Sequence, residues 1–147
     1  MATVIVALVA SGPALGSPPE KLPSNVPFPV AEAVKLSGTY RYGDGLGVDI
    51  HLTLKSDSSY LATWRNCGGL YGDASGVWSV QTTTLVQRTP TKALVLSPLA
   101  ETGGMNGFLR TLDLVEAEGH LVFVRPDNRD SFKRRGVRPS NCFQRQE

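Results

Sequence analysis

The clearest pattern in the chain is a strict alternation of apolar and polar residues over positions 48–55. The apolar members are Val48, Ile50, Leu52 and Leu54, and a polar residue follows each of them. A period of two places alternate side chains on opposite faces of a β-strand. This segment therefore predicts a strand with one buried and one solvated face, which is typical of an antiparallel sheet.

Seven further segments have the length and composition of strands, and most are bounded by turns rich in glycine, serine, aspartate or proline. They are residues 38–42, 59–65, 74–81, 85–88, 92–97, 108–115 and 120–124. Before them, residues 29–36 predict a short helix of two turns, because proline suits the first helical position and Gly38 follows closely. Eight short strands in simple succession favour a mainly β fold, an eight-stranded antiparallel up-and-down barrel, with a β-sandwich as the alternative.

The composition fits one folded domain. The chain has 147 residues, of which 41% are hydrophobic and 19% charged, so a disordered chain is not expected. Fifteen glycines and ten prolines argue against long helices. The net charge of +2 is too small to indicate a nucleic-acid-binding protein, and no nucleic-acid partner is expected.

Positive charge is concentrated near the C-terminus. Residues 125–147 carry seven Lys or Arg residues against three Asp or Glu residues. Four of these cations lie close together, at Lys133, Arg134, Arg135 and Arg138. They could face an anionic surface or an acidic partner, or they could form a solvated basic edge.

The N-terminus indicates export. Residues 2–10 are apolar or small except for Thr3, and Ala14 and Gly16 are small residues spaced as a signal peptidase requires. We therefore expect a signal peptide over residues 1–16, a proline-rich linker over 17–29 and a barrel domain over 30–147, in a secreted or periplasmic protein. The apolar run is too short for a transmembrane helix.

The chain has two cysteines, Cys67 and Cys142. Both occur in segments that resemble loops, and two cysteines exclude a zinc site made of cysteines alone. In an oxidising compartment they could form a disulfide that closes a long loop and pins the C-terminal segment to the barrel. Two free thiols are the alternative.

Several segments resemble those of small secreted bacterial proteins with lipocalin-like barrels. Gly38-Thr39-Tyr40 stands where lipocalins carry a glycine and a tryptophan on the first strand. The glycine-rich segments 43–47 and 67–72 and the tryptophan-bearing segments 60–64 and 74–78 are also similar. The resemblance spans about residues 38–143 and implies a fold and a compartment, but no activity.

A barrel of this kind either fills its interior with side chains or holds one small ligand. Six residues could line such an interior: Tyr40, Tyr60, Trp64, Trp78, Phe108 and Arg110. Arg110 shares the inward parity of its predicted strand, so it needs a partner such as Glu101 or an open cavity. It could anchor an anionic headgroup, or it could be a structural arginine stacked on an aromatic ring. The first function hypothesis is a non-catalytic module that binds a small apolar or amphipathic ligand.

Two other hypotheses stay open. The protein could be a structural or interaction protein of the cell envelope that acts through its surface. It could instead be an enzyme built on Asp49, His51 and His120, although no motif brings these residues together. The glycine-rich segment 43–47 lacks the lysine of a phosphate-binding loop and predicts a turn. No metal site and no cofactor are expected.

Overall fold

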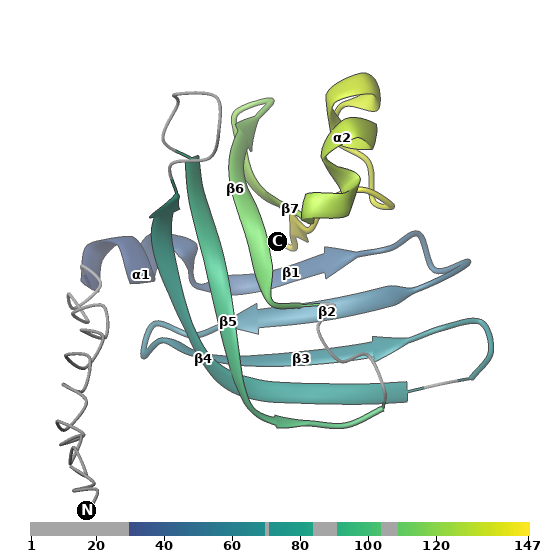
Figure 1. Cartoon of the computed structure of the whole chain (residues 1–147), viewed down its shortest axis with the longest axis horizontal. Coiled ribbons are helices and arrows are strands. Elements are labelled where there is room, and N and C mark those ends of the chain that lie inside the picture. Colours follow the sequence, from purple (N-terminus) through teal and green to yellow (C-terminus); the bar gives the residue numbers. More distant parts are fainter. Residues whose placement is uncertain (1–29, 70, 84–90, 104–108) are drawn as a thin grey trace, which may run out of the picture.

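The computed structural model describes residues 30–69, 71–83, 91–103 and 109–147 (Figure 1). The expected signal peptide, the linker, the strand at 85–88 and Phe108 lie outside the described residues. The helical elements are α1 (Val30–Leu36), the short 3-10 helix η1 (Pro126–Asn128) and α2 (Arg129–Arg135). The strands are β1 (Gly38–Tyr42), β2 (Asp49–Leu54), β3 (Ser59–Arg65), β4 (Tyr71–Thr83), β5 (Thr91–Glu101), β6 (Thr111–Ala117), β7 (His120–Val124) and β8 (Gln144–Arg145).

The strands form one antiparallel sheet that is nearly closed into a barrel. From β1 to β7 each strand pairs with the next one in the chain, and β8 returns to pair with β1. A bridge between Phe123 and Phe143 joins β7 to the residue before β8. The predicted eight-stranded antiparallel up-and-down barrel is therefore confirmed, although the strand beside β1 is β8, which the sequence pattern did not predict.

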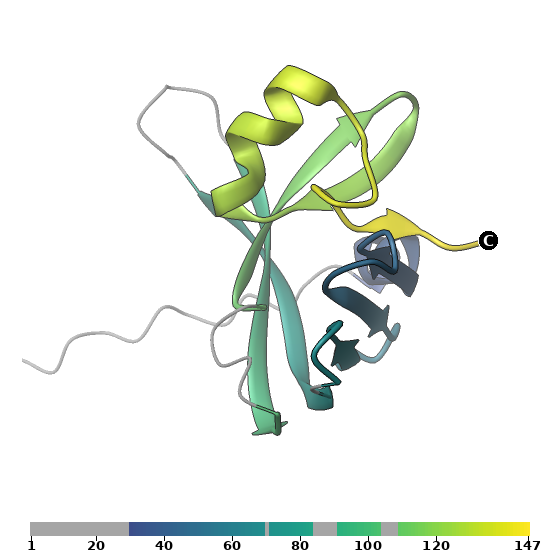
Figure 2. The same ribbon diagram turned by 90° about the vertical axis from the view of Figure 1, so that its right-hand side faces the viewer.

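The long strands β4 and β5 let the sheet bend. The first half of β4 pairs with β3 and most of its length pairs with β5, so β4 belongs to both halves of the barrel. Figures 1 and 2 show β1, β2 and β3 running across the direction of β5, β6 and β7. A bulge between Ser75 and Gly76 marks the bend, and a Cβ atom on Gly76 would collide with the Ser97 carbonyl oxygen.

The core fills the inside of the barrel. It includes Leu52 and Leu54 from the alternating segment, so the face predicted to be buried is the inner face. At one end Ala33 and Leu36 of α1 join this core, and the Tyr40 hydroxyl donates a 2.8 Å hydrogen bond to the Leu36 carbonyl oxygen. The predicted N-terminal helical turns therefore act as a plug.

The C-terminal segment packs on the outside of β6 and β7. Arg129 at the start of α2 pairs with Asp113 of β6, and the Asn128 amide donates to the Tyr42 hydroxyl at 2.9 Å. Under α2 a second apolar cluster contains Val122, Val124 and Cys142, with Phe132 and Val137 at its edge. α2 itself was not predicted.

The predicted disulfide between Cys67 and Cys142 is not present, because both cysteines are free thiols. Cys67 is exposed in the turn after β3, whereas Cys142 is fully buried in the cluster under α2. Bonding to Cys67 would require Cys142 to leave that cluster. Burial of Cys142 and Phe143 and pairing of β8 hold the C-terminal segment instead.

Candidate functional site

The interior residues predicted to line a ligand site are packed together. Tyr40, Tyr60, Trp64 and Trp78 all belong to the buried core. The cavity beside two of them, Tyr60 and Trp64, has a volume of only ≈ 10 Å³. That volume is about what one water molecule needs. The structure therefore brings these predicted residues together as core residues, and the cavity that the described residues form beside Tyr60 and Trp64 has room for about one water molecule.

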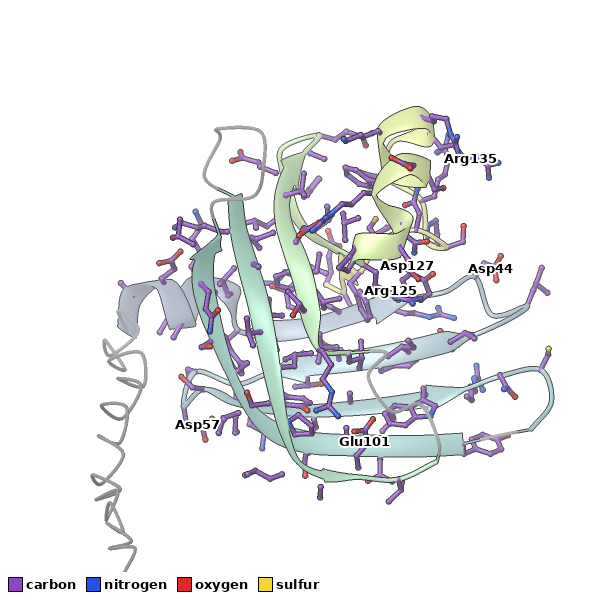
Figure 3. All side chains as sticks on the ribbon, viewed as in Figure 1. Asp44, Asp57, Glu101, Arg125, Asp127 and Arg135 are labelled. Carbon is purple, nitrogen blue, oxygen red and sulfur yellow. The ribbon has the colours of Figure 1, made fainter. Side chains whose placement is uncertain are left out.

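Arg110 lies at the mouth of the barrel, just before β6. Its guanidinium Nη2 is 3.3 Å from a carboxylate oxygen of Glu101, which is the partner expected from the sequence. About half of the arginine side chain is exposed, and Arg110 precedes β6, so it is not the inward-facing strand residue that the sequence predicted. Figure 3 labels Glu101 at the end of β5. The pair bridges β5 to the start of β6 at the rim.

The indole Nε1 of Trp64 is buried and has no hydrogen-bond partner. It is the one such side-chain nitrogen or oxygen in the described part of the chain. Its ring lies over Gly72, the residue opposite it on β4, and a Cβ atom there would collide with the indole. The strand pairing thus needs glycine at this position to seat the tryptophan. One water in the small cavity would satisfy the indole N–H.

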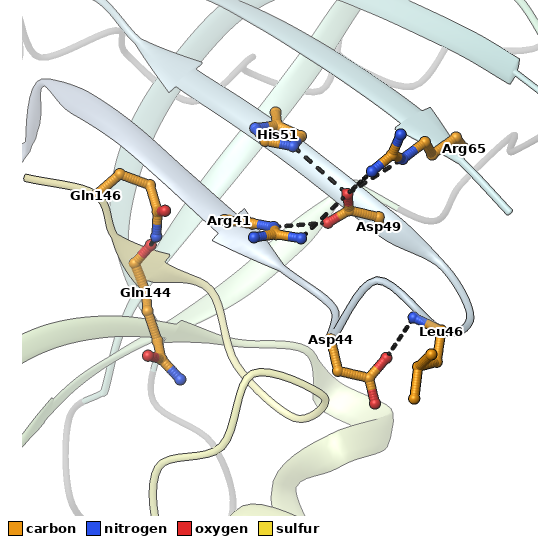
Figure 4. Close-up of polar contacts among 8 residues, drawn as sticks. All are labelled: Arg41, Asp44, Leu46, Asp49, His51, Arg65, Gln144 and Gln146. Atoms are coloured by element: carbon orange, nitrogen blue, oxygen red, sulfur yellow. Dashed lines mark hydrogen bonds and ion pairs between the residues drawn. The ribbon is translucent and has the colours of Figure 1, made fainter.

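The most polar arrangement lies outside the barrel, around Asp49 on β2 (Figure 4). Arg41 donates to this carboxylate from Nε at 2.8 Å and from Nη2 at 3.4 Å. Arg65 donates from Nη2 at 3.2 Å and from Nε at 3.3 Å. The Nε2 atom of His51 lies 3.6 Å from the same carboxylate. Although Asp49 belongs to the outer face, its side chain is only 1% exposed, because these partners cover it.

Strand register explains this cluster. Asp49 lies directly opposite Arg65 on β3, and His51 lies directly opposite Arg41 on β1. Arg41 is therefore diagonal to Asp49, within reach of a long side chain. The sequence predicts Asp49 and His51 as candidate site residues but does not indicate either arginine. The hairpin turn at 56–58 was a usable signal, because it fixes the register that places Arg65 beside Asp49.

The electrostatics of the cluster are asymmetric. The hydrogen bond from Arg41 lowers the pKa of Asp49, and desolvation opposes that shift without reversing it. The same hydrogen bond raises the pKa of Arg41. One carboxylate thus faces two permanent cations and an imidazole, which leaves at least one positive charge without a counterion in the cluster.

A groove runs beside this cluster. It has a volume of ≈ 270 Å³ and is lined by Asp49, His51, Thr63, Trp64, Arg65 and Tyr71. The side chains of Arg65 and His51 are 60% and 49% exposed, so both can meet a ligand from solvent. Tyr71 on β4, directly opposite Arg65, is 70% exposed and offers an aromatic face next to the cations.

The other predicted polar residues lie elsewhere. His120 begins β7 and lines a different groove from Asp49 and His51, so the structure does not assemble the three as a catalytic set. Lys133, Arg134 and Arg135 form the last turn of α2, and Arg138 follows it. All four are exposed, and none forms an ion pair within the described residues. Figure 3 shows Arg135 projecting from α2 away from the barrel.

Among the described residues, no group of three or more His, Cys, Asp or Glu side chains could hold a metal ion. No helix in the described ranges is long and apolar enough to cross a membrane. No protein-family model, no curated protein and no solved structure matches this chain. The resemblance to lipocalin-like secreted proteins stays a prediction.

Proposed function

We propose that this protein is a non-catalytic binding module that recognises an anionic group of its partner on the outer face of β1, β2 and β3. The observation that carries this proposal is the charge balance around Asp49, where Arg41 and Arg65 share a single carboxylate. Each guanidinium has five N–H donors, and only two of each are directed at Asp49. The remaining donors can bind a carboxylate or a phosphate.

The packing of the barrel favours a surface site over an interior one. A small apolar ligand would need space among Tyr40, Tyr60, Trp64 and Trp78, all of which are core residues. The ≈ 10 Å³ cavity beside Tyr60 and Trp64 supports a filled barrel. Of the two kinds of binding protein expected from the sequence, the one that acts through its surface is the better supported.

A binding role also agrees better with the Asp49 cluster than catalysis does. The lone pairs of this carboxylate already accept hydrogen bonds from two arginines, so it is a poor general base. The cluster is prearranged, because neighbouring strands fix the backbone of every member. The signal-like residues 1–16 support a secreted or periplasmic location, which we propose as well.

The basic turn of α2 is a second candidate surface for an anionic partner. Lys133, Arg134 and Arg135 are exposed and lack ion pairs within the described residues. Cations in the last turn also stabilise a helix through its dipole, so their position has a structural reason as well. This second role has less support than the first, because none of the three lines the groove beside the Asp49 cluster or the groove that contains His120.

The test is a titration of the full-length protein with inorganic phosphate. Binding is monitored through the NMR signals of the His51 ring and of the Arg41 and Arg65 side chains. We expect saturable shifts that weaken as ionic strength rises. Arg65→Gln should reduce the affinity about tenfold, which corresponds to the loss of one charge-assisted hydrogen bond. Arg41 stays in place to hold Asp49 in that variant.

The matched control is Arg134→Gln, which removes the same charge from α2 and should leave the affinity within about twofold of the wild type. If Arg134→Gln weakens binding and Arg65→Gln does not, the α2 surface is the site. If the His51 ring shows no saturable shift, the Asp49 cluster has only a structural role.

A further inference from the structure

The barrel is incompletely closed along one seam, between β7 and β8. Phe123 and Phe143 exchange two backbone hydrogen bonds across this seam, with N···O distances of 3.2 Å and 2.7 Å. In an antiparallel ladder the next pair of this kind lies two residues away on each strand. That pair is Leu121 and Arg145, and no backbone hydrogen bond joins them within the described chain.

The backbone groups of Leu121 point into the seam. Ala117 and His120 flank a two-residue hairpin turn at Glu118 and Gly119, whose φ angles are 55° and 75°. Such a turn makes its flanking residues a hydrogen-bonded pair, so His120, and then every second residue of β7, bonds to β6. The N–H and C=O of Leu121 therefore face away from β6.

The backbone of Arg145 faces the seam from the other side. Gln146 donates its N–H to the Thr39 carbonyl oxygen at 2.8 Å, so Gln146 and Gln144 direct their backbone groups at β1. Arg145, between them, directs its own toward β7. Its guanidinium is occupied at the Ser37 carbonyl oxygen, 2.6 Å away, and at that of Lys35, 3.4 Å away.

A groove occupies this open part of the seam. Its volume is ≈ 460 Å³, within the range of about 300–1,000 Å³ that is usual for ligand sites. Ala117, Val122 and Val137 give it an apolar wall. Glu118 and Glu147 give it an acidic rim. The Arg145 guanidinium does not neutralise this rim, because it bonds to the carbonyl oxygens of Lys35 and Ser37.

We infer that this groove binds an extended peptide, which adds to β7 as a further strand at Leu121. A free N–H and C=O on one strand edge are the groups that a peptide backbone completes. The apolar wall suits small or β-branched side chains, and the acidic rim suits a basic residue beside them. This site is separate from the proposed anion site, and neither depends on the other.

The test is amide hydrogen exchange of the full-length protein, alone and with the capped peptide acetyl-Lys-Thr-Val-Thr-Val-Lys-amide. In the free protein we expect the Leu121 amide to exchange at least tenfold faster than the Val122 amide, which bonds to β6. Saturating peptide should slow exchange at Leu121 at least tenfold. Replacing the first valine of the peptide by proline, which has no N–H, should abolish that protection.

A variant checks the place of binding. Gln146→Trp fills the groove from an exposed position and should weaken the peptide about tenfold, whereas Gln81→Trp on exposed β4 should not change its binding. The proposal is wrong if millimolar peptide leaves Leu121 unprotected or if the proline peptide protects it equally. Protection that rises with protein concentration alone would identify a second copy of the chain as the occupant and overturn the peptide proposal.

Discussion

Asp49 lies on β2, on the outer face of the barrel. It is buried, and its carboxylate links β1, β2 and β3 through Arg41 and Arg65. Those arginines stay partly exposed, so the bond that stabilises the sheet also fixes the direction of two cations. The cluster therefore has a structural explanation and a binding explanation, which the variants separate.

Asp49→Asn should make the free energy of unfolding depend less on pH in the acid range. The folded-state pKa of Asp49 lies below its unfolded value, so its contribution is fully present above about pH 4 and is lost as the pH falls through the folded-state pKa. At neutral pH the variant should lose about 2 kcal/mol of unfolding free energy, with some relief because the arginines can reach water.

Urea unfolding at pH 7 and at pH 3 measures this effect. The difference between wild type and Asp49→Asn should shrink at the lower pH. The control is Asp130→Asn, which removes an exposed carboxylate from α2 and gives the same change in net charge. An undiminished difference at pH 3 would show that Asp49 does not stabilise the fold through its charge.

The hairpins show how far local sequence determines an element. The bounds of β1 and β3 agree with the predicted segments, and β2 differs from its prediction only at the ends. β4 and β5 are longer than predicted, because pairing with β3 extends the start of β4, and pairing between β4 and β5 extends the end of β4 and both ends of β5. α2 was missed, although Pro126 before it and Gly136 after it are usual boundary signals.

The turn between β2 and β3 contains a residue in an unfavourable conformation. Ser58 has a φ of 66°, a left-handed conformation that costs L-residues roughly 1–2 kcal/mol and glycine almost nothing. Ser58→Gly should therefore raise the free energy of unfolding by about 0.5 kcal/mol after the larger chain entropy of glycine is included.

Ser56→Gly, in the same turn, is the matched control, because Ser56 is not among the described residues with positive φ. It should lower stability by about 0.5–1 kcal/mol. Thermal unfolding of both variants beside the wild type gives the sign of each change. Equal destabilisation by the two substitutions would contradict the left-handed conformation at Ser58.

On the scale of the whole molecule, the C-terminal segment brings the barrel close to closure. Phe143 is fully buried in the main core and Cys142 in the cluster under α2, so consecutive residues pack on opposite sides of the barrel wall. Arg145 joins this segment to α1 through the Ser37 carbonyl oxygen. Burial and strand pairing therefore perform the role that the sequence suggested for a disulfide.

Thiol labelling tests this arrangement. In the native protein Cys67 should react with Ellman's reagent and Cys142 should not, because Cys142 is buried and burial raises the pKa of its thiol. In guanidinium chloride both should react. If neither thiol reacts before reduction and the mass is lower by two hydrogen atoms, the cysteines are bonded and the cluster under α2 must rearrange.

The sequence by itself determined the local features of this protein. Alternation set which residues face inward on β2 and β3, since a strand has a fixed period of two. The N-terminal helical turns and most turns between strands followed from proline, glycine and aspartate for similarly local reasons.

Only the tertiary structure decided the closure of the barrel, the state of the cysteines and both candidate sites. The closure depends on partners that are distant in the chain, such as Arg145 and Ser37, which are 108 residues apart. The Asp49 cluster depends on residues 8 and 16 positions from Asp49, which lie on the two neighbouring strands. Alternation fixes the face of a residue but not its neighbour on the next strand, which register decides. Register assembled Arg41, Asp49 and Arg65, and the end of register after Phe123 and Phe143 left the seam open.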